Sequence, residues 1–544
     1  MTDTLKYNST AAAFAAGALV GALTATAIAY QTIPSREPSA VETALTKAGV
    51  PFIAPGTKGW AKATQRFNQR LEPVIPLIVV RPTTAKQVQK AVAIAATHVL
   101  KVSAKSGGHS YGNFCFGEAG TMVINLDQMY GVTLHSDNSA TVRAGSRLGH
   151  VATELYRQGK RGISHGSCPS VGLAGHALHG GYGFSSNKYG LALDWITGMH
   201  VVLADGSQVY ASRTVNKDLF WAMRGAGSSF GIAVRFNIVT FPAPEQLAWM
   251  KIRIGIGRDR AAALAGLKAW QEYVERGVPE DMTIRLFLSD NPSAGVFLEA
   301  MYFGSPEKAR EVLEPLTEPL ELDWEAESST VHTGNWPEHV AAFNDRSDGL
   351  VDVKGADYSV DHHYASSLLT RHIPDAALEA FVDYWFAVGQ TDTRGDWWIQ
   401  MDIHGGKHSG ITCALGGETS FPHRDKMWLF QFFDRTGSQP DYSKTYVFLN
   451  GFMDAIKNNM PADNWGRYAN YADSQLGRAD ALEQYYANSL PRLRAIKAAY
   501  DPEDMFHSQQ SVDLPAPGGS ELDIEVEKLV KLDGFDGRLW DWKE

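Results

Sequence analysis

Cysteine is scarce in this sequence: its 544 residues include only Cys115, Cys168 and Cys413. So few thiols exclude a disulfide framework, and a chain of this length can bury large hydrophobic cores without one. Basic residues are not in excess either, because 60 Asp and Glu outnumber 50 Lys and Arg and give a formal net charge of −10. No run of Lys and Arg is long enough to follow a phosphate backbone, so we expect no nucleic-acid partner.

Internal repeats and low-complexity blocks are also missing, which excludes solenoid architectures. Residues 11–30 form the one long apolar run, AAAFAAGALVGALTATAIAY, which carries no charge. About 20 residues at about 1.5 Å each are enough to cross a hydrocarbon core, so residues 1–34 are predicted to anchor the chain to a membrane of the secretory pathway. The alternative is a signal peptide cleaved after the small residues Ala27 and Ala29, which would release a secreted protein.

The remaining sequence alternates between strand-like and helix-like patterns. Residues 76–80 form a short apolar run, and residues 84–97 have apolar residues at helical spacing behind a Thr cap. With further strand-like runs between Gly-rich turns, this predicts an α+β domain over residues 67–242. A second domain, over residues 243–460, is predicted to contain a mixed or antiparallel sheet covered by helices. Residues 480–499 are predicted to form one long helix.

The first glycine-rich motif is SAKSGGHSYGN, residues 103–113, which follows a strand-like run. Gly107 and Gly108 can turn backbone N–H groups toward one anionic group, although an ordinary hairpin turn would use the same residues. Residues 108–112 also fit G-x-S-x-G, with Ser110 in the position of a hydrolase nucleophile. That fold requires a helix directly after the serine, and no helical period follows, which disfavours a hydrolase.

The second motif, residues 163–190, contains glycines at a density that favours backbone wrapped around a flat group. His165, His176 and His179 lie in it, but no carboxylate or further cysteine stands at ligand spacing, so we expect no metal. Residues 225–231, GAGSSFG, miss the third glycine of the dinucleotide fingerprint by one position. They lead into a strand-like run at Ile232, whereas the fingerprint opens a helix.

With the C-terminal stretches YANYADSQLG and YYANSLPRLRAIKAAYDPEDMFHSQQSV, these motifs resemble the berberine-bridge-enzyme branch of the vanillyl-alcohol-oxidase-type flavoproteins. Within that branch the sequence is similar to fungal gluco-oligosaccharide and chito-oligosaccharide oxidases, over about residues 70–512. The resemblance implies a two-subdomain FAD-binding domain and a substrate domain whose sheet lies over the flavin. It also implies that residues 461–515 return to the FAD domain and that residues 516–544 form a tail.

The resemblance implies two covalent bonds to FAD. His109 matches the histidine bonded to the flavin 8α-methyl group, and Cys168 matches the cysteine bonded to C6. A double tether leaves an open site and makes the flavin more electron-poor. Val171 matches a position that controls oxygen access, and its small side chain favours an oxidase. The positions expected to contact FAD, the first four at the pyrophosphate, are Ser106, Gly107, Gly108, Ser110, Val171, Gly172, Gly175 and Ile232.

The catalytic residues implied by the resemblance are Tyr471, as general base, and Asp402, as its partner. A free phenol has a pKa near 10, so Tyr471 needs such a partner or a positive neighbour to act at neutral pH. Strand alternation would place Trp398, Gln400 and Asp402 on one face, offering an indole, an amide and a carboxylate to a sugar. The remaining substrate-binding positions are Tyr111, Tyr182, Gln431 and Arg435.

The predicted reaction is oxidation of the C1 hydroxyl at an oligosaccharide reducing end to a lactone, with O2 reduced to H2O2 by a monomeric enzyme. Arg435 departs from the pattern, because the oligosaccharide oxidases have asparagine there. One alternative is therefore an FAD-linked oxidoreductase acting on alcohols or phenolic intermediates of fungal secondary metabolism. Another is a carbohydrate-binding protein without catalytic activity.

Overall fold

The computed structural model describes residues 38–289, 296–342, 360–392, 395–414, 417–435 and 443–516. Among these residues, no helix has both the length and the apolar character needed to cross a membrane. The predicted anchor at residues 11–30 and the tail from residue 517 lie outside the described residues.

The first subdomain is built on a four-stranded sheet with strand order β1-β2-β4-β3. β2 and β3 both pair with β4 in parallel, and β1 adds an antiparallel edge. The predicted helix at residues 84–97 is confirmed as α4, with the Thr84 side chain accepting a hydrogen bond from Gln87 N. The elements are α2 (Ala40–Ala48), β1 (Phe52–Ile53), α3 (Trp60–Ala63), β2 (Ile78–Val80), α4 (Ala85–Thr97), β3 (Val102–Lys105), η1 (Phe114–Phe116) and β4 (Met122–Asn125).

The second subdomain has a five-stranded antiparallel sheet of order β5-β6-β10-β8-β9. One hydrophobic core runs through both subdomains. A separate two-stranded ladder pairs β7 with β11. The elements are β5 (Val132–Leu134), β6 (Ser139–Arg143), α5 (Leu148–Gly159), β7 (Arg161–Gly162), α6 (Leu173–Ala177), α7 (Ser186–Tyr189), β8 (Ile196–Val202), β9 (Gln208–Ser212), α8 (Lys217–Ala226), η4 (Gly227–Ser229), β10 (Ile232–Val239) and β11 (Phe241–Pro242).

A nine-stranded sheet forms the second half of the molecule, with order β15-β12-β14-β13-β18-β19-β17-β20 and β16 beside β12. Every pair in it is antiparallel. Its strands are β12 (Leu247–Ile254), β13 (Met282–Ser289), β14 (Val296–Tyr302), β15 (Leu322–Asp323), β16 (Thr330–Gly334), β17 (Tyr364–Thr370), β18 (Trp397–Ile403), β19 (Trp428–Asp434) and β20 (Trp465–Gly466).

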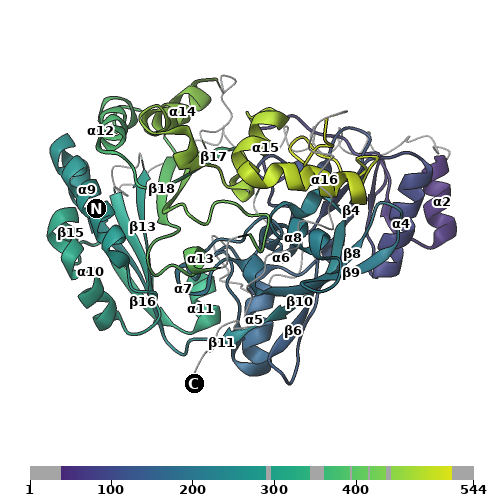
Figure 1. The fold of residues 1–544 in the computed structure, drawn as a ribbon, viewed down its shortest axis with the longest axis horizontal. Coiled ribbons are helices and arrows are strands. Elements are labelled where there is room, and N and C mark those ends of the chain that lie inside the picture. The colour runs from purple at the N-terminus through teal and green to yellow at the C-terminus, as the bar shows by residue number, and fades with distance from the viewer. Residues whose placement is uncertain are drawn as a thin grey trace, which may run out of the picture.

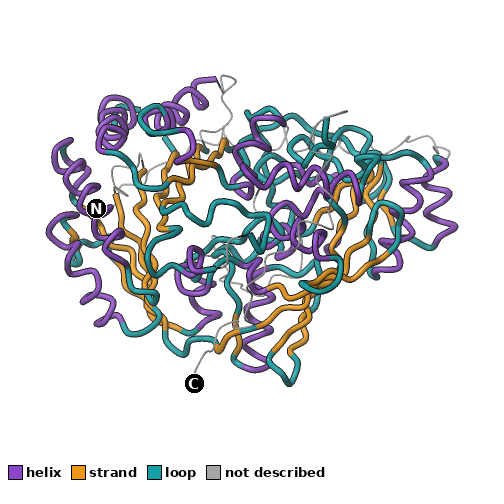
Figure 2. The backbone as a smooth tube through the Cα atoms, viewed as in Figure 1, coloured by secondary structure: helices purple, strands orange, loops and turns teal. Residues whose placement is uncertain are grey.

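Helices cover one face of this sheet, and the other face turns toward the first two subdomains (Figure 1). Apolar side chains of the alternating strands pack under these helices in a second core. The helices of this domain are α9 (Arg260–Gly277), α10 (Pro306–Leu320), α11 (Trp336–Ala342), α12 (Asp375–Tyr384), α13 (Gly410–Cys413) and α14 (Ser443–Lys457). Figure 2 shows the three sheets as separate groups of strands with loops between them. The predicted α+β fold class is confirmed.

The C-terminal segment joins both halves of the molecule. β20 pairs with β17, η8 (Ala469–Tyr471) follows, and α15 (Arg478–Tyr486) and α16 (Leu490–Tyr500) then lie over the first half (Figure 1). The prediction of one helix over residues 480–499 is wrong. The chain breaks at Ala487, which has φ +42°, and restarts with Pro491 in the first turn of α16. Proline lacks an N–H and suits the first turn of a helix rather than its interior.

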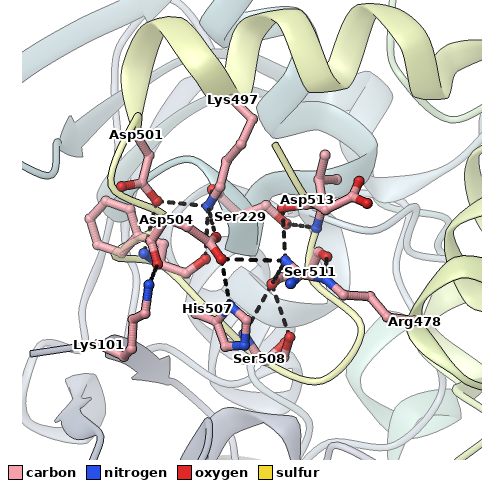
Figure 3. Close-up of polar contacts among 12 residues, drawn as sticks. Lys101, Ser229, Arg478, Lys497, Asp501, Asp504, His507, Ser508, Ser511 and Asp513 are labelled. Atoms are coloured by element: carbon pink, nitrogen blue, oxygen red, sulfur yellow. Dashed lines mark hydrogen bonds and ion pairs between the residues drawn. The ribbon is translucent and has the colours of Figure 1, made fainter. Parts of the chain in front are cut away.

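A buried lysine joins α16 to the first half of the molecule (Figure 3). Lys497 Nζ donates to the Ser229 carbonyl over 2.8 Å, to the Phe506 carbonyl over 3.0 Å and to Asp501 Oδ2 over 2.7 Å. Both charged side chains of the Lys497–Asp501 pair are 0% exposed. This cluster holds the returning segment in place.

Candidate active site

The two glycine-rich motifs meet as loops in direct backbone contact. A Cβ on Gly107 would lie 2.2 Å from Gly172 N, and a Cβ on Gly172 would lie 2.3 Å from Gly107 N. Neither position can therefore hold a side chain. Gly108 follows with φ +80°, a conformation that favours glycine. The loop–loop contact brings the segments that carry His109 and Cys168 together.

Arg147 forms hydrogen bonds with both loops. Its guanidinium is 2% exposed and donates to the Gly107 carbonyl over 3.2 Å and to the Ser170 carbonyl. The adjacent Leu148 N–H donates to the Val171 carbonyl over 2.9 Å. One buried cation thus fixes both loops to the start of α5.

His109 and Cys168 lie in different environments, one buried and one exposed. Burial, reinforced by the positive charges of Arg147 and Lys105, lowers the pKa of His109 to about 3, so its imidazole is neutral at physiological pH. Its ring lies 4.7 Å from that of Phe67. Cys168 is an exposed cysteine outside any disulfide, and a negative charge on it is among the causes, after burial, that raise the pKa of Tyr111. Cys115 and Cys413 do not form a disulfide with each other.

One side of the short helix α6, beside these loops, is open. A Cβ on Gly175, in α6, would meet nothing within 4 Å, so this side of the helix is open. The Ser106 hydroxyl donates to the Ala144 carbonyl over 2.7 Å and Ser110 Oγ accepts from Phe114 N over 3.0 Å. Both serines therefore shape the loop. Backbone N–H groups at Gly107 and Gly108 are suited to donate to a phosphate.

Two sequence interpretations find no support at this site. Ser110 is followed by the 3₁₀ turn η1, not by the α-helix that a hydrolase nucleophile requires. The histidines of the second motif bond to protein groups: Gly166 N donates to His176 Nε2 over 2.8 Å, and His179 Nε2 lies 2.9 Å from Ser228 Oγ.

Ile232, predicted to contact the cofactor, is a buried core residue at the start of β10.

The side chains of β18 follow the predicted alternation. Trp397, Ile399 and Met401 belong to the core under the helices. Trp398, Gln400 and Asp402 occupy the opposite face, where Gln400 pairs with Gln431 of β19 and Trp398 pairs with Phe433. The indole of Trp398 is stacked on Phe433 at 4.2 Å, so one of its faces is already covered by protein.

Arg435 lies at the rim of this face. Its guanidinium is 4.9 Å from the centre of the Trp398 ring, and its Nε donates to Asp361 Oδ2 over 2.6 Å. The side chain is 41% exposed.

Tyr111 links the cofactor loop to the substrate sheet. Gln431 Nε2 donates to the Tyr111 hydroxyl over 2.8 Å. The Tyr111 ring is stacked with that of Tyr471 at 5.9 Å and 16°. The structure thus brings together three residues that are far apart in the sequence: Tyr111, Gln431 and Tyr471.

Asp402 is 2% exposed, and burial raises its pKa to about 6. The positive charge of Arg285, directly opposite on β13, limits this rise. Arg285 Nε also donates to Glu299 Oε2 over 2.6 Å and its NH1 donates to Gln400 Oε1 over 3.3 Å. Sequence reasoning missed Arg285 and Glu299. The sequence signal that could have identified them is a charged residue inside an otherwise apolar strand, Arg285 in β13 and Glu299 in β14.

Among the residues that the structure describes, no hydrogen bond joins the Tyr471 hydroxyl to Asp402, its predicted partner. Burial, followed by the negative charge of Asp402, raises the pKa of Tyr471 well above its usual value. Tyr182 lies between domains and donates its hydroxyl to the Ile403 carbonyl over 2.9 Å. A neutral phenol at Tyr471 and an ionisable carboxylate at Asp402 are thus close enough to interact electrostatically.

Comparison with known proteins identifies two families along the chain. Residues 76–212 match the FAD binding domain and residues 467–513 match the berberine and berberine-like family. A carbohydrate oxidase from Microdochium nivale is 40% identical over 479 residues, covering 87% of this chain and 94% of that protein. The FAD-linked oxidoreductase dpmaF of Metarhizium anisopliae is 40% identical over 481 residues, covering 88% and 92%.

A solved structure has the same fold. The glucooligosaccharide oxidase of Acremonium strictum, described with a 6-S-cysteinyl, 8α-N1-histidyl FAD, superposes with a TM-score of 0.82 at 36% sequence identity. The match covers 88% of this chain and all of that one. Together with the glycine-lined loops, these matches show that the chain is an FAD-linked oxidoreductase of the berberine-bridge-type family.

Proposed function

We propose that this protein oxidises the C1 hydroxyl at the reducing end of an oligosaccharide to a lactone and passes the electrons to O2, giving H2O2. The observation that carries the proposal is the 2.8 Å bond between Gln431 and Tyr111, which brings the polar sheet face against the cofactor loop. The names of the carbohydrate and glucooligosaccharide oxidases support the substrate class.

FAD is proposed to be held by two covalent bonds, from His109 and Cys168. The neutral imidazole of His109 and the exposed thiol of Cys168 support this, as does the doubly bonded FAD of the glucooligosaccharide oxidase. Bound FAD supplies the two-electron acceptor for the hydride that leaves C1 of the sugar. The small side chain of Val171, which is half-buried in the same loop as Cys168, supports an oxidase.

The proton leaves the substrate hydroxyl through Tyr471. The pKa of Tyr471 is raised, so its phenol is protonated at neutral pH. As Tyr471 accepts the proton of the substrate hydroxyl, it must therefore give its own proton to another group. Asp402 is the carboxylate in electrostatic reach, and its Oδ2 has no hydrogen-bond partner among the described residues. We therefore assign proton acceptance to the Tyr471–Asp402 pair. Trp398, Gln400 and Gln431 would orient the sugar ring.

Replacing Tyr471 by Phe tests this assignment. The variant should reduce its flavin at least about a hundredfold more slowly, because it cannot take the hydroxyl proton. Its absorbance spectrum and the yellow colour of the acid-precipitated protein should match wild type. Stopped-flow reduction under anaerobic conditions gives the rate. A wild-type rate would remove Tyr471 as the base, and colour lost from acid-precipitated wild type would refute covalent attachment.

A second candidate is oxidation of a small alcohol or phenolic intermediate. Arg435, a charged residue where the oligosaccharide oxidases are expected to have asparagine, favours it, as does the likeness to the FAD-linked oxidoreductase dpmaF. Arg435 and Asp361 would then narrow the rim of the site against a second sugar ring.

Residues 11–30 are proposed to direct the chain into the secretory pathway, where they remain as a membrane anchor or are removed. Their uncharged, apolar composition supports this role. Expression in a fungal host of the full chain, and of a variant that begins at residue 35, checks it by fractionation of membranes, cytosol and medium. The shortened variant should stay in the cytosol, and its export would contradict the proposal.

A further inference from the structure

Three N–H groups lie within hydrogen-bond distance of the phenol oxygen of Tyr468. The backbone N–H groups of Gly181 and Tyr182 each donate over 2.9 Å, and Asn470 Nδ2 donates over 2.9 Å. The orientation of the Asn470 amide is fixed, because the same Nδ2 lies 2.9 Å from the His176 carbonyl oxygen, which an amide oxygen would repel. Tyr468 is 2% exposed, so protein donors satisfy its oxygen.

The two backbone donors converge because of the glycines beside them. Gly180 and Gly181 have φ values of +123° and +89°, and such turns direct successive N–H groups toward one electronegative atom. A Cβ on Gly180 would lie 2.8 Å from Tyr468 Cε2. This end of the second glycine-rich motif is therefore shaped around a tyrosine from the C-terminal segment.

The backbone of Tyr468 is tied to the substrate sheet at the same time. Its N–H donates to Ser367 Oγ over 3.0 Å, and Ser367 Oγ lies 3.4 Å from its carbonyl oxygen. Ser367 belongs to β17, which also pairs with β20 just before Tyr468. One residue thus connects the turn at 180–182 with the substrate sheet.

The groups proposed to move the proton lie at the two ends of this connection. Tyr471 follows one 3₁₀ turn later, with its ring edge-on to Tyr468 at 5.0 Å. Tyr182 donates its N–H to Tyr468 and its hydroxyl to the Ile403 carbonyl, next to Asp402. A displaced Tyr468 would therefore change the separation between Tyr471 and Asp402.

We propose that Tyr468 is a positioning residue for proton transfer, whose phenol oxygen locks Tyr471 at a fixed distance from Tyr182 and from Asp402, the neighbour of Ile403. Because Tyr468 is enclosed, it acts through these residues and does not touch the substrate. The inference rests on the proposed role of Tyr471 as the base. Misplacement of a catalytic group by about 1 Å costs up to about a hundredfold in rate, so the lock has a measurable effect.

The variant Tyr468→Phe removes the acceptor and keeps the ring. Tyr485→Phe is a matched control: this buried tyrosine of the same segment accepts from Asp473 N over 2.9 Å and donates to Gln510 Oε1 over 3.1 Å. Flavin reduction is measured in the holoenzymes with whichever cello-, malto-, xylo- or chito-oligosaccharide reduces wild type fastest. Tyr468→Phe should lower the limiting rate about tenfold or more, leave the sugar Kd within about twofold and shift the pH profile.

Tyr485→Phe should keep both the limiting rate and the pH profile. Gly180→Ala, which crowds the Tyr468 ring while keeping its hydroxyl, should reproduce the rate loss. Covalent flavin content and Tm are recorded for every variant. A wild-type rate and pH profile in Tyr468→Phe would overturn the inference, as would an equal loss in Tyr485→Phe. A fully active Tyr471→Phe would instead overturn the proposed base, whereas an inactive Tyr471→Phe beside a normal Tyr468→Phe would refute only the lock.

Discussion

Asp402 is a buried carboxylate beside one cation, and this environment determines when it can accept a proton. With its pKa raised to about 6, it is ionised at neutral pH and protonated in mild acid. If Asp402 must be ionised for proton transfer, flavin reduction should fall as pH decreases through about 6. Asp402→Asn should be slow at every pH and should lack this limb. A pH profile that is flat between 5 and 7 in wild type would contradict the role.

The same carboxylate affects stability in the opposite direction. Because the folded-state pKa of Asp402 is raised above 3.8, its contribution to stability is fully present below pH 4 and is lost as pH rises through about 6. Two pKa units correspond to about 3 kcal/mol at most. Asp402→Asn should therefore raise the Tm at pH 8 and leave it unchanged at pH 4. If Asp402→Asn had a lower Tm than wild type at pH 8, the favourable interactions of the ionised carboxylate with its partners would outweigh the cost of burying its charge.

Single residues of the site differ in how far the sequence predicts them. His109, Cys168 and Tyr471 stand in recognisable motifs, so their roles could be proposed before the structure. Arg285 could not, because its importance comes from register: β13 places it directly opposite Asp402. Tyr468 was likewise hidden, since its partners Gly181 and Tyr182 lie far from it in the sequence.

The position of α16 is stabilised by a buried ion pair at its C-terminal end. Lys497 and Asp501 are 0% exposed, and Asp501 also accepts from Met505 N and Phe506 N, each over 2.8 Å. Lys497→Met would leave a buried carboxylate without its cation, which costs about 3 kcal/mol or more. We expect a clearly lower Tm in thermal unfolding of the holoenzyme, and partial recovery when Asp501→Asn is added.

Arg157→Met is the control for this prediction. Its ion pair with Glu154 lies on the surface, where solvent screens the interaction, and Tm should hardly change. Equal Tm values for Lys497→Met and wild type would show that the buried pair does not hold the returning segment.

Elements with strong periodicity were predictable, and breaks in them were not. The helix at residues 84–97 and the strands at β13, β14 and β19 follow from apolar spacing and caps. The division between α15 and α16 does not, because helical periodicity continues across it and only the left-handed Ala487 with Pro491 ends the first helix. The apolar periodicity of a sequence indicates its propensity to form a helix, but tertiary contacts decide where that helix ends.

At the scale of the whole molecule, the site exists only because three segments meet. The loops at 106–112 and 168–175 form the cofactor side, β18 and β19 form the substrate side, and the C-terminal segment brings Tyr471 between them. Sequence pattern predicted the α+β class and the kinds of layers. The relative placement of the layers depends on long-range bonds, such as Gln431 to Tyr111, that no local pattern contains.

The most direct test of the whole account is anaerobic reduction of the purified holoenzyme by a panel of substrates. Cello-, malto-, xylo- and chito-oligosaccharides are added separately, alongside small aromatic alcohols, while flavin absorbance is followed. The account predicts that at least one oligosaccharide bleaches the flavin, and that admitting O2 restores the colour with one H2O2 formed per sugar oxidised. Bleaching by aromatic alcohols alone, with no oligosaccharide active, would contradict it.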